Sequence, residues 1–353
     1  MGSEIVMPDI EEFGFQWHIT NSCNQRCRHC YQDKFSNSSD FELHHLKRIA
    51  DRIFLSLRNI PVTVNVTGGE PLLHRDLFPL LRHLATYNNL KELNLITNAL
   101  EIDEAILREL KKNGALSAIK ISLESHDSSI NDSIRGKGHF EAVLNSIELL
   151  QSAGLQVVLM VTLGAWNWNS VSGLLQLARQ KGVKGVIFER FVPLGNGLHI
   201  ADGILNANHW LEIRKTIISE NDLGISPEEL LPYRAFFIDT QETENIGGEI
   251  GAALCNLGPQ SMALMPDGTV YPCRRLPIPV GVLPSDSFPK VLKDLSKYSP
   301  LRLMPKLTKG GCGDCALLDC MGCRAQALSH SGTVYGDDPQ CDKILKHEEK
   351  KFV

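Results

Sequence analysis

The chain has 353 residues, which is enough for one large domain and a smaller one. Apolar residues make up 43% and charged residues 22%, and the net charge of −5 gives no electrostatic reason to expect nucleic acid or an anionic membrane as a partner. No run of about 18 apolar residues predicts a membrane helix, and the N-terminus lacks the layout of a signal peptide. We therefore expect a cytoplasmic protein, in which thiols stay reduced.

Short apolar runs alternate with amphipathic segments through the first half of the chain. Each run has the length of a buried strand, and the segments between them have helical periodicity. Six such repeats predict an α/β fold with parallel strands and crossover helices, either a doubly wound sheet or an incomplete barrel of the TIM type. The expected strands are 13–20, 62–69, 91–98, 118–125, 156–163 and 185–193, and the expected helices include 41–57, 102–114, 140–154 and 206–219.

In both architectures the functional edge lies at the C-terminal ends of the parallel strands. Unusual residues fall at this edge, and we expect an active site where they meet. They are Cys23, Cys27 and Cys30 after the first strand, Gly68, Gly69 and Glu70 after the second, Asn98 at the end of the third, Ser122 and Glu124 at the end of the fourth, and residues 193–197 after the sixth.

The amino-acid composition of the chain changes after the helix expected at 206–219. Residues 1–12 form a tail, 13–220 carry the strand and helix repeats, and 221–250 are polar with scattered glycine and proline, which predicts a bridge. Residues 251–353 are rich in glycine, proline and cysteine and poor in long periodic runs. This composition predicts a small domain that is stabilised by metal more than by a hydrophobic core.

Ten cysteines in a reducing compartment indicate metal sites rather than disulfides. The first three, Cys23, Cys27 and Cys30, have the spacing C-x3-C-x2-C. Thiolates are ligands of both zinc and iron–sulfur clusters. Zinc would need a fourth ligand, for which His18 or His29 is available, whereas a 4Fe–4S cluster on three thiolates would leave one iron free to bind a second molecule. The spacing alone leaves both open.

This spacing, on the loop after the first strand, resembles the radical S-adenosylmethionine (radical SAM) superfamily. The resemblance implies a partial (β/α)6 TIM-like barrel and a cluster whose free iron chelates the amino and carboxylate groups of SAM. It further implies that one electron from the cluster cleaves the sulfonium, and that the resulting 5′-deoxyadenosyl radical abstracts hydrogen from the substrate. An electron donor such as flavodoxin or ferredoxin would be a partner.

Other stretches match the same family. TGGEP at 67–71 is similar to the motif beside the SAM amino group, and SLES at 122–125 to the segment that binds the ribose or carboxylate. IRGKGHF at 134–140 resembles the segment with a SAM-facing arginine, and RFVPLGNG at 190–197 resembles the element that lines the adenine site. The residue before the third cysteine is where the family often places a ring against adenine. The implied cofactor-binding residues are His29, Gly68, Gly69, Glu70, Asn98, Ser122, Glu124, Arg135 and Leu194.

The remaining seven cysteines resemble the SPASM extension, which holds two auxiliary 4Fe–4S clusters in some radical SAM enzymes. Its first motif, C-x(9–15)-G-x4-C, is met by Cys255, Gly268 and Cys273, whereas the last two gaps of its second motif are each one residue shorter here. The resemblance implies a first auxiliary cluster on Cys255, Cys273 and Cys323, with an open iron or a further ligand such as Ser261, Asp267 or a substrate thiolate. It implies a second auxiliary cluster on Cys312, Cys315, Cys320 and Cys341.

A zinc ribbon made from Cys312, Cys315, Cys320 and Cys323 is the alternative for this region. Its central gap of four residues is well short of the usual zinc spacing of roughly 12 or more. The resemblance to the SPASM extension, which this spacing favours over a zinc ribbon, therefore implies three 4Fe–4S clusters in total.

SPASM enzymes mostly modify peptides or proteins, so the resemblance implies a maturase of a ribosomally made peptide that contains cysteine. An open auxiliary iron would suit thioether or selenoether crosslinking, and residues 15–32 also resemble maturases of cysteine- or selenocysteine-containing peptides. A barrel that begins at residue 13 leaves no room for an N-terminal leader-binding domain, so we expect a separate chain or the small domain to hold a leader.

Three other functions stay open. A haem-precursor decarboxylase would use Arg274 and Arg275 to meet carboxylates. A sulfatase maturase would need an aspartate base directly after Cys273, where this chain has Arg274. A non-enzymatic iron–sulfur carrier would need no SAM-binding strand ends. No catalytic acid or base is assigned, although His18, Asn98, Glu189 and Arg190 are expected near the barrel mouth.

Overall fold

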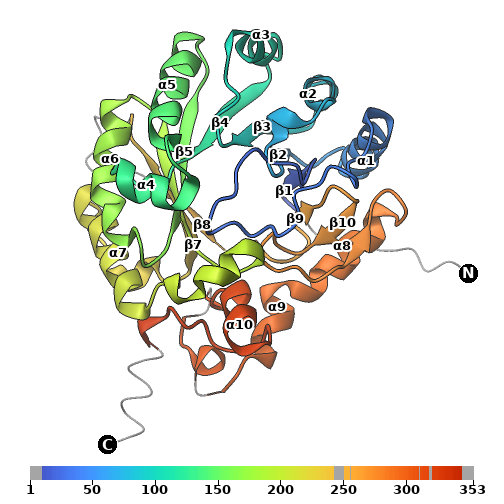
Figure 1. Ribbon diagram of the computed structural model, residues 1–353. Coiled ribbons are helices and arrows are strands. Elements are labelled where there is room, and N and C mark those ends of the chain that lie inside the picture. Colours follow the sequence, from blue (N-terminus) through green and yellow to red (C-terminus); the bar gives the residue numbers. More distant parts are fainter. Residues whose placement is uncertain (1–9, 242–249, 255, 310, 318–319, 344–353) are drawn as a thin grey trace, which may run out of the picture.

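The computed structural model describes residues 10–241, 250–254, 256–309, 311–317 and 320–343, and of 250–254 the backbone alone. Six strands pair in parallel in chain order, and helices cover their outer face (Figure 1). The predicted α/β fold with a partial barrel is confirmed. The strands are β1 (Phe13–His18), β2 (Val62–Thr67), β3 (Leu90–Thr97), β4 (Leu116–Ser122), β5 (Val157–Leu163) and β6 (Gly185–Arg190).

The helices around the barrel bury one face each against the sheet. In α1 the buried side chains recur at helical spacing, from Leu46 to Phe54, as expected for an amphipathic surface helix. Asp103 caps α3 by accepting a hydrogen bond of 2.8 Å from the Ile106 amide. The helices are α1 (Leu43–Ser56), α2 (Leu77–Leu84), α3 (Glu104–Lys112), α4 (Ser128–Arg135), α5 (His139–Ser152), α6 (Val171–Gln180) and α7 (Ala207–Glu220).

The later part of the chain extends the barrel sheet at both of its edges. The segment expected as a bridge contains β7 (Tyr233–Asp239), which pairs antiparallel with β6 and is followed by β8 (Ile250–Leu254). At the other edge, β9 (Ser261–Leu264) pairs in parallel with β1, and β10 (Thr269–Tyr271) and β11 (Gly281–Val282) follow it. Together with β1 to β6 they form one sheet, to which the described residues contribute eleven strands.

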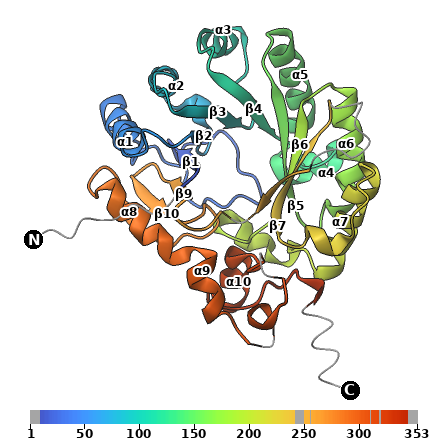
Figure 2. The same ribbon diagram turned by 180° about the vertical axis from the view of Figure 1, so that it is seen from behind.

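The C-terminal region closes one side of the barrel with few regular elements (Figures 1 and 2). Its helices are α8 (Phe288–Leu295), α9 (Pro300–Leu303) and α10 (Arg324–Ser331). The large hydrophobic core lies between the barrel sheet and its helices. A second, smaller cluster of apolar side chains joins the C-terminal region to the segment after β6 and consists of Val192, Leu257, Leu276, Leu303, Leu307, Met321 and Ala325.

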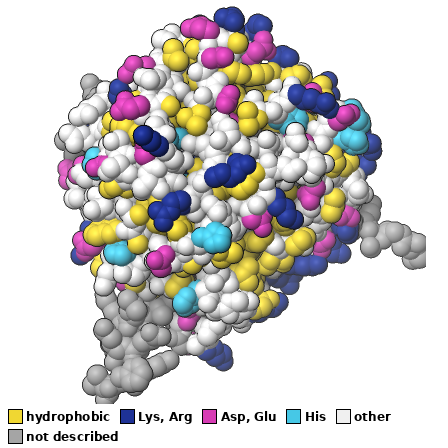
Figure 3. Space-filling model, in the orientation of Figure 1, with side chains coloured by type: hydrophobic (Ala, Val, Ile, Leu, Met, Phe, Trp, Pro, Cys, Tyr) yellow, Lys and Arg dark blue, Asp and Glu magenta, His cyan; other side chains and the backbone are white. Residues whose placement is uncertain are grey.

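The outer surface agrees with the modest net charge. Figure 3 shows basic and acidic side chains interspersed over the face seen in Figure 1, without a patch of one sign. Within the part of the chain that the structure describes, no helix has the length and apolar character that crossing a bilayer requires.

Candidate active site and thiol cavities

The loop that carries the first three cysteines is attached to the turn after β2 by backbone hydrogen bonds. The amide of Gly69 donates to the Thr20 carbonyl and the amide of Glu70 to the Ser22 carbonyl, both at 2.8 Å. A Cβ atom at Gly69 would lie only 2.2 Å from the Ser22 carbonyl oxygen. The turn therefore needs glycine at this position, because its backbone must lie directly against the cysteine loop.

A second attachment comes from the segment after β6. This segment begins the 3-10 helix η3 (Gly195–Gly203). The amide of Gly197 donates to the Cys30 carbonyl at 2.8 Å, and the Asn196 side-chain amide donates to the Cys27 carbonyl at 2.8 Å. The cysteine loop is thus held from two strand ends that lie far apart in the sequence.

All three thiols line one cavity at the C-terminal ends of the barrel strands. We call it the active-site cavity. Of the predicted cofactor-binding residues, six also line it, namely His29, Gly68, Gly69, Asn98, Ser122 and Arg135. Glu70 and Glu124 are fully buried beside it. Leu194 is not among the described residues that line the cavity, because its side chain packs against the smaller hydrophobic cluster.

Glu70 connects the turn after β2 to the end of β3. Its carboxylate accepts hydrogen bonds from the Leu72 amide at 3.1 Å, the Thr97 hydroxyl at 2.7 Å and the Asn98 amide at 2.8 Å. Burial raises the pKa of Glu70 to about 7, and these hydrogen bonds offset part of the rise. The contacts of this carboxylate within the chain are therefore those of a scaffold, and its predicted SAM contact stays a prediction.

The pKa of Glu124 is shifted in the opposite direction to that of Glu70. Its carboxylate lies 2.9 Å from the Arg135 Nε atom and 3.2 Å from the His29 Nε2 atom, and it accepts a hydrogen bond of 2.7 Å from the Thr162 amide. Burial alone would raise the pKa of Glu124, but the Arg135 guanidinium and the His29 ring outweigh it and hold the pKa at about 2. Arg135 also lies 3.7 Å from the Cys27 sulfur, which places a buried ion pair beside the thiols.

Tyr31 and Arg274 form a contact that the sequence patterns did not indicate. The Arg274 guanidinium lies 3.6 Å from the centroid of the Tyr31 ring. The Tyr31 hydroxyl donates to the Gly68 carbonyl at 3.1 Å and lies 3.3 Å from the His18 Nδ1 atom. The neighbouring Arg275 is neutralised by Glu189 at 3.4 Å. In the described chain no carboxylate lies within ion-pair distance of Arg274, so its charge faces the active-site cavity uncompensated.

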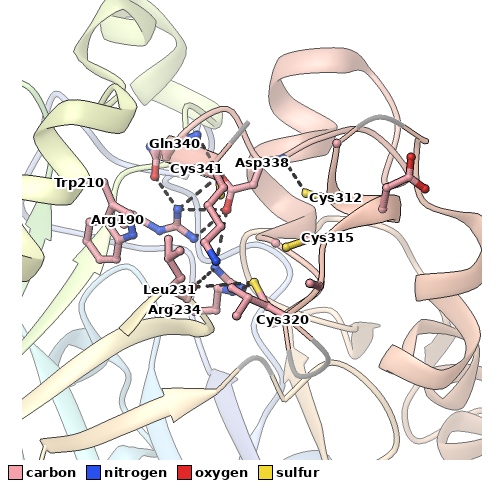
Figure 4. A pocket seen from close by; sticks show the side chains of 16 residues that line it. Arg190, Trp210, Leu231, Arg234, Cys312, Cys315, Cys320, Asp338, Gln340 and Cys341 are labelled. Carbon is pink, nitrogen blue, oxygen red and sulfur yellow. Dashed lines mark hydrogen bonds and ion pairs between the residues drawn. The ribbon is translucent and has the colours of Figure 1, made fainter. Parts of the chain in front are cut away.

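The later cysteines line two further cavities. One, shown in Figure 4 and called here the four-thiol cavity, is lined by Cys312, Cys315, Cys320 and Cys341. The other, the two-thiol cavity, is lined by Cys273 and Cys323. This is the grouping that the resemblance implied for the two auxiliary clusters, except that Cys255 lies outside the described residues.

The chemistry of the lining side chains fits an iron–sulfur cluster, because several cysteine thiols line each of two cavities. A cubane cluster spreads its thiolate ligands around a body of iron and sulfide. A cavity lined by several cysteines is the arrangement that such a cluster fits, and the active-site and four-thiol cavities both provide it.

The three cavities border one another at charged side chains. Arg190 lines both the active-site cavity and the four-thiol cavity. Arg234 lines both the four-thiol and the two-thiol cavities. Glu189, Arg274 and Arg275 line both the two-thiol and the active-site cavities. Arginines therefore stand at every boundary between two thiol-bearing cavities.

A comparison with protein families supports the interpretation of the cysteine motif. Residues 17–178 match the radical SAM superfamily. These residues are a radical SAM domain. Membership of this superfamily implies a 4Fe–4S cluster, and it makes the protein a radical SAM enzyme, as the sequence patterns predicted.

Relatives and solved structures extend the similarity over most of the chain. The AdoMet-dependent heme synthase of Nitratidesulfovibrio vulgaris is 25% identical over 339 residues, covering 92% of this chain and 90% of the relative. The mycofactocin maturase MftC of Mycobacterium tuberculosis is 25% identical over 337 residues, covering 92% and 81%. The structure of native anSMEcpe with bound AdoMet and the Cp18Cys peptide has a TM-score of 0.70 at 19% identity and covers 97% of both chains, which shows a shared fold.

Proposed function

We propose that this radical SAM enzyme cleaves SAM reductively and uses the 5′-deoxyadenosyl radical to modify a peptide. The observation that carries the proposal is that Cys23, Cys27 and Cys30 line one cavity at the C-terminal rim of the barrel, together with Gly69 and Ser122. Three thiols suit a cubane cluster that keeps one iron for SAM. When bound, the cluster supplies the electron and SAM supplies the radical.

The residues of the chain would hold and shield these groups. The backbone attachments from Gly69 and Gly197 fix the shape of the cysteine loop before any ligand binds. Arg135, beside the Cys27 sulfur, offsets thiolate charge in a buried setting, and Glu124 keeps this guanidinium in place. Ser122 and Asn98 line the cavity with polar groups that suit the ribose or the amino acid part of SAM.

We further propose that residues 251–353 are a SPASM domain with two auxiliary clusters. The four-thiol cavity supplies four cysteine ligands for the second cluster, and Cys273 and Cys323 would share the first with Cys255. Similarity to MftC and to the peptide-bound anSMEcpe structure supports a peptide substrate. An open iron on the first auxiliary cluster would bind a substrate thiolate during thioether formation, and an external donor such as flavodoxin or ferredoxin would supply electrons.

A second candidate is a small molecule that carries carboxylates, as expected for a relative of the AdoMet-dependent heme synthases. The specific observation in its favour is Arg274, whose charge faces the active-site cavity without a described carboxylate partner. A carboxylate is the natural counterion of an arginine in such a position.

The first experiment tests the radical SAM chemistry with no substrate. The full-length protein, reconstituted without oxygen, should contain about twelve iron and twelve sulfide per chain if it holds three cubane clusters. With dithionite and SAM it should release 5′-deoxyadenosine. Zinc in place of iron, or no 5′-deoxyadenosine under strong reductant, would contradict the proposal and favour a metal scaffold or carrier.

The second experiment separates the two substrate classes. Cysteine-containing peptides encoded beside the gene and a porphyrin with propionate side chains are each incubated with the enzyme, and products are analysed by mass spectrometry. A peptide that loses a pair of hydrogen atoms only when its cysteines are intact supports thioether formation. A porphyrin whose propionate becomes a vinyl group, with loss of carbon dioxide and two hydrogen atoms, supports the second candidate and overturns the first.

The variant Arg274→Gln further distinguishes a substrate that carries carboxylates from a peptide that is bound through a thiolate. For a carboxylate-bearing substrate, we expect the KM to rise by about tenfold, because a charge-assisted hydrogen bond is lost, while 5′-deoxyadenosine release without substrate stays unchanged. For a substrate held by its thiolate, the KM should change little. Arg82→Gln, in an exposed ion pair with Glu109, is the matched control.

A further inference from the structure

A buried acid, Asp338, links the four-thiol cavity to the barrel (Figure 4). Its carboxylate is 2% exposed and accepts hydrogen bonds from Arg190 at 3.1 and 3.2 Å. It also accepts a hydrogen bond of 2.8 Å from the Cys323 amide. Arg190 ends β6, so this one carboxylate joins a barrel strand to the cysteine-bearing C-terminal segment.

The same carboxylate holds a second arginine against a thiol. Arg234, on β7, lies 3.7 Å from Asp338 through one guanidinium nitrogen. Through its other terminal nitrogen it donates to the Cys320 sulfur at 3.1 Å. The backbone amide of Asp338 itself donates to the Cys312 sulfur at 3.5 Å. Two N–H groups whose positions depend on Asp338 therefore point at two of the four thiols.

These contacts have a redox consequence for a cluster bound in the cavity. A 4Fe–4S cluster on four thiolates carries negative charge, and reduction adds one more electron. Hydrogen-bond donors to the sulfurs and nearby positive charge stabilise the reduced state more than the oxidised state, which raises the reduction potential. Beside this cavity both Arg190 and Arg234 contact the carboxylate of Asp338, and the Arg234 guanidinium places a positive charge directly against the Cys320 sulfur. Asp314 and Lys343 also line the cavity and add charges of opposite sign.

We propose that Arg234, anchored by Asp338, is a positioning residue that raises the reduction potential of the cluster on Cys312, Cys315, Cys320 and Cys341. The proposal rests on the proposed function, because it needs a cluster in the four-thiol cavity. It goes further in naming a side chain that makes this cluster accept an electron more readily, and β7 as the strand that carries it.

The test is a redox titration of the reconstituted full-length protein, followed by electron paramagnetic resonance. The signal that is missing from Cys315→Ala identifies the cluster of the four-thiol cavity. In Arg234→Gln we expect the ratio of reduced to oxidised cluster at a fixed solution potential to fall by about tenfold, which is about 59 mV for a one-electron couple. Arg234→Lys keeps the charge without the planar fork and should shift the same signal less, in the same direction.

Controls separate the possible failures. Arg82→Gln, which alters an exposed ion pair, should leave the potential unchanged. An unchanged potential in Arg234→Gln at full iron content overturns the inference. Loss of the cluster from both Arg234 variants also overturns it, in favour of a role in assembly. If the unaltered protein has no signal that depends on Cys315, the auxiliary cluster itself is absent, and the iron count assigns that failure to the proposed function.

Discussion

The barrel and the C-terminal region hold their cysteines by different physical means. In the barrel, hydrogen bonds from the ends of β2 and from η3 shape the cysteine loop, as the contacts of Gly69 and Gly197 illustrate. In the C-terminal region, buried charged side chains surround the thiols. Arg324 is fully buried and donates to the carbonyls of Val334 at 2.9 Å and Gly336 at 2.7 Å, and it lies 3.6 Å from the Cys312 sulfur.

This difference follows from the local structure. The barrel loop joins elements of a continuous sheet, so neighbouring strand ends supply its backbone partners. The C-terminal region has short helices and a small apolar cluster, so side-chain guanidinium groups satisfy the carbonyls there instead. Buried ion pairs add little net stability compared with apolar packing, whereas a bound metal centre contributes directly to folding. We therefore expect the barrel site to be preformed and the C-terminal site to depend on its clusters.

The largest expected effect is that of Cys27→Ala on SAM cleavage. The Cys27 thiol lines the active-site cavity, and its loss would leave two thiolates for the SAM-binding cluster. We expect release of 5′-deoxyadenosine to be abolished. The thermal unfolding midpoint should change little, because the attachments of the loop use main-chain atoms. Ser36→Ala, at an exposed position shortly after the loop, is the control. A large loss of stability in Cys27→Ala would contradict a preformed loop.

Cys315→Ala should affect the C-terminal region and leave the barrel site intact. We expect the iron content to fall by about one cluster and turnover of the substrate to stop, while some uncoupled cleavage of SAM continues at the intact barrel site. The unfolding midpoint should fall further than in Cys27→Ala, because the C-terminal region depends on its ligands for stability. Full product formation by Cys315→Ala would show that the auxiliary role is wrong.

The electrostatics of the barrel site predict a marked acid sensitivity. Arg135 and His29 hold the pKa of Glu124 at about 2, against an ordinary value of 4.5. Because the folded pKa is depressed, the stabilisation is fully present above about pH 5 and is lost as the pH falls toward 2. It amounts to about 3 kcal/mol, from the 1.36 kcal/mol that each pKa unit represents. Glu70 has the opposite effect. Its pKa is raised to about 7, so its contribution to the free energy of unfolding is lost as the pH rises from about 4.5 to 7.

Arg135→Met tests the contribution of Glu124. Without the guanidinium, burial raises the pKa of Glu124 in the folded protein. Protonation of Glu124 at low pH then no longer lowers the free energy of unfolding. Urea unfolding of the metal-free, reduced protein between pH 3 and 7 should show a smaller fall in the free energy of unfolding than in the unaltered protein. Arg82→Met, which alters an exposed pair, should keep the full acid dependence. An equal acid dependence in Arg135→Met would mean that Glu124 is not held by this ion pair.

The parts that could be predicted from the sequence are those with local signals. The six barrel strands follow from runs of β-branched residues, and the position of the cysteine loop at the rim follows from parallel topology. β7 was missed, although the buried and half-buried residues of YRAFFID alternate, because its segment lies among polar residues. The grouping of the later thiols came from a family resemblance, and no periodicity could have supplied it.

The remaining contacts of the site could not be predicted because they join residues without a shared local pattern. Arg190 and Asp338 are 148 positions apart, and neither is distinguished by its neighbours in the sequence. The motif did not indicate that the Glu124 carboxylate pairs with Arg135 and His29 inside the chain, and its contact with SAM stays a prediction. Leu194 packs on the small apolar cluster, which the motif also did not indicate, and its predicted contact with adenine stays a prediction. Side-chain direction at a strand end depends on tertiary partners, which the motif itself does not specify.

Asn196→Ala should have the smallest effect on SAM cleavage. It tests whether main-chain hydrogen bonds, rather than side chains, hold the cysteine loop of the barrel. This change removes one hydrogen bond to the Cys27 carbonyl, worth roughly 1 kcal/mol, but keeps the main-chain bonds from Gly197 to Cys30 and from Asn196 to Gln32. The rate of 5′-deoxyadenosine release should therefore fall only a few-fold, and Leu198→Ala, at a side chain 60% exposed, should not change it. If Asn196→Ala were as inactive as Cys27→Ala, one side-chain amide would be controlling the loop, and the barrel site would then depend on side chains much as the C-terminal site does.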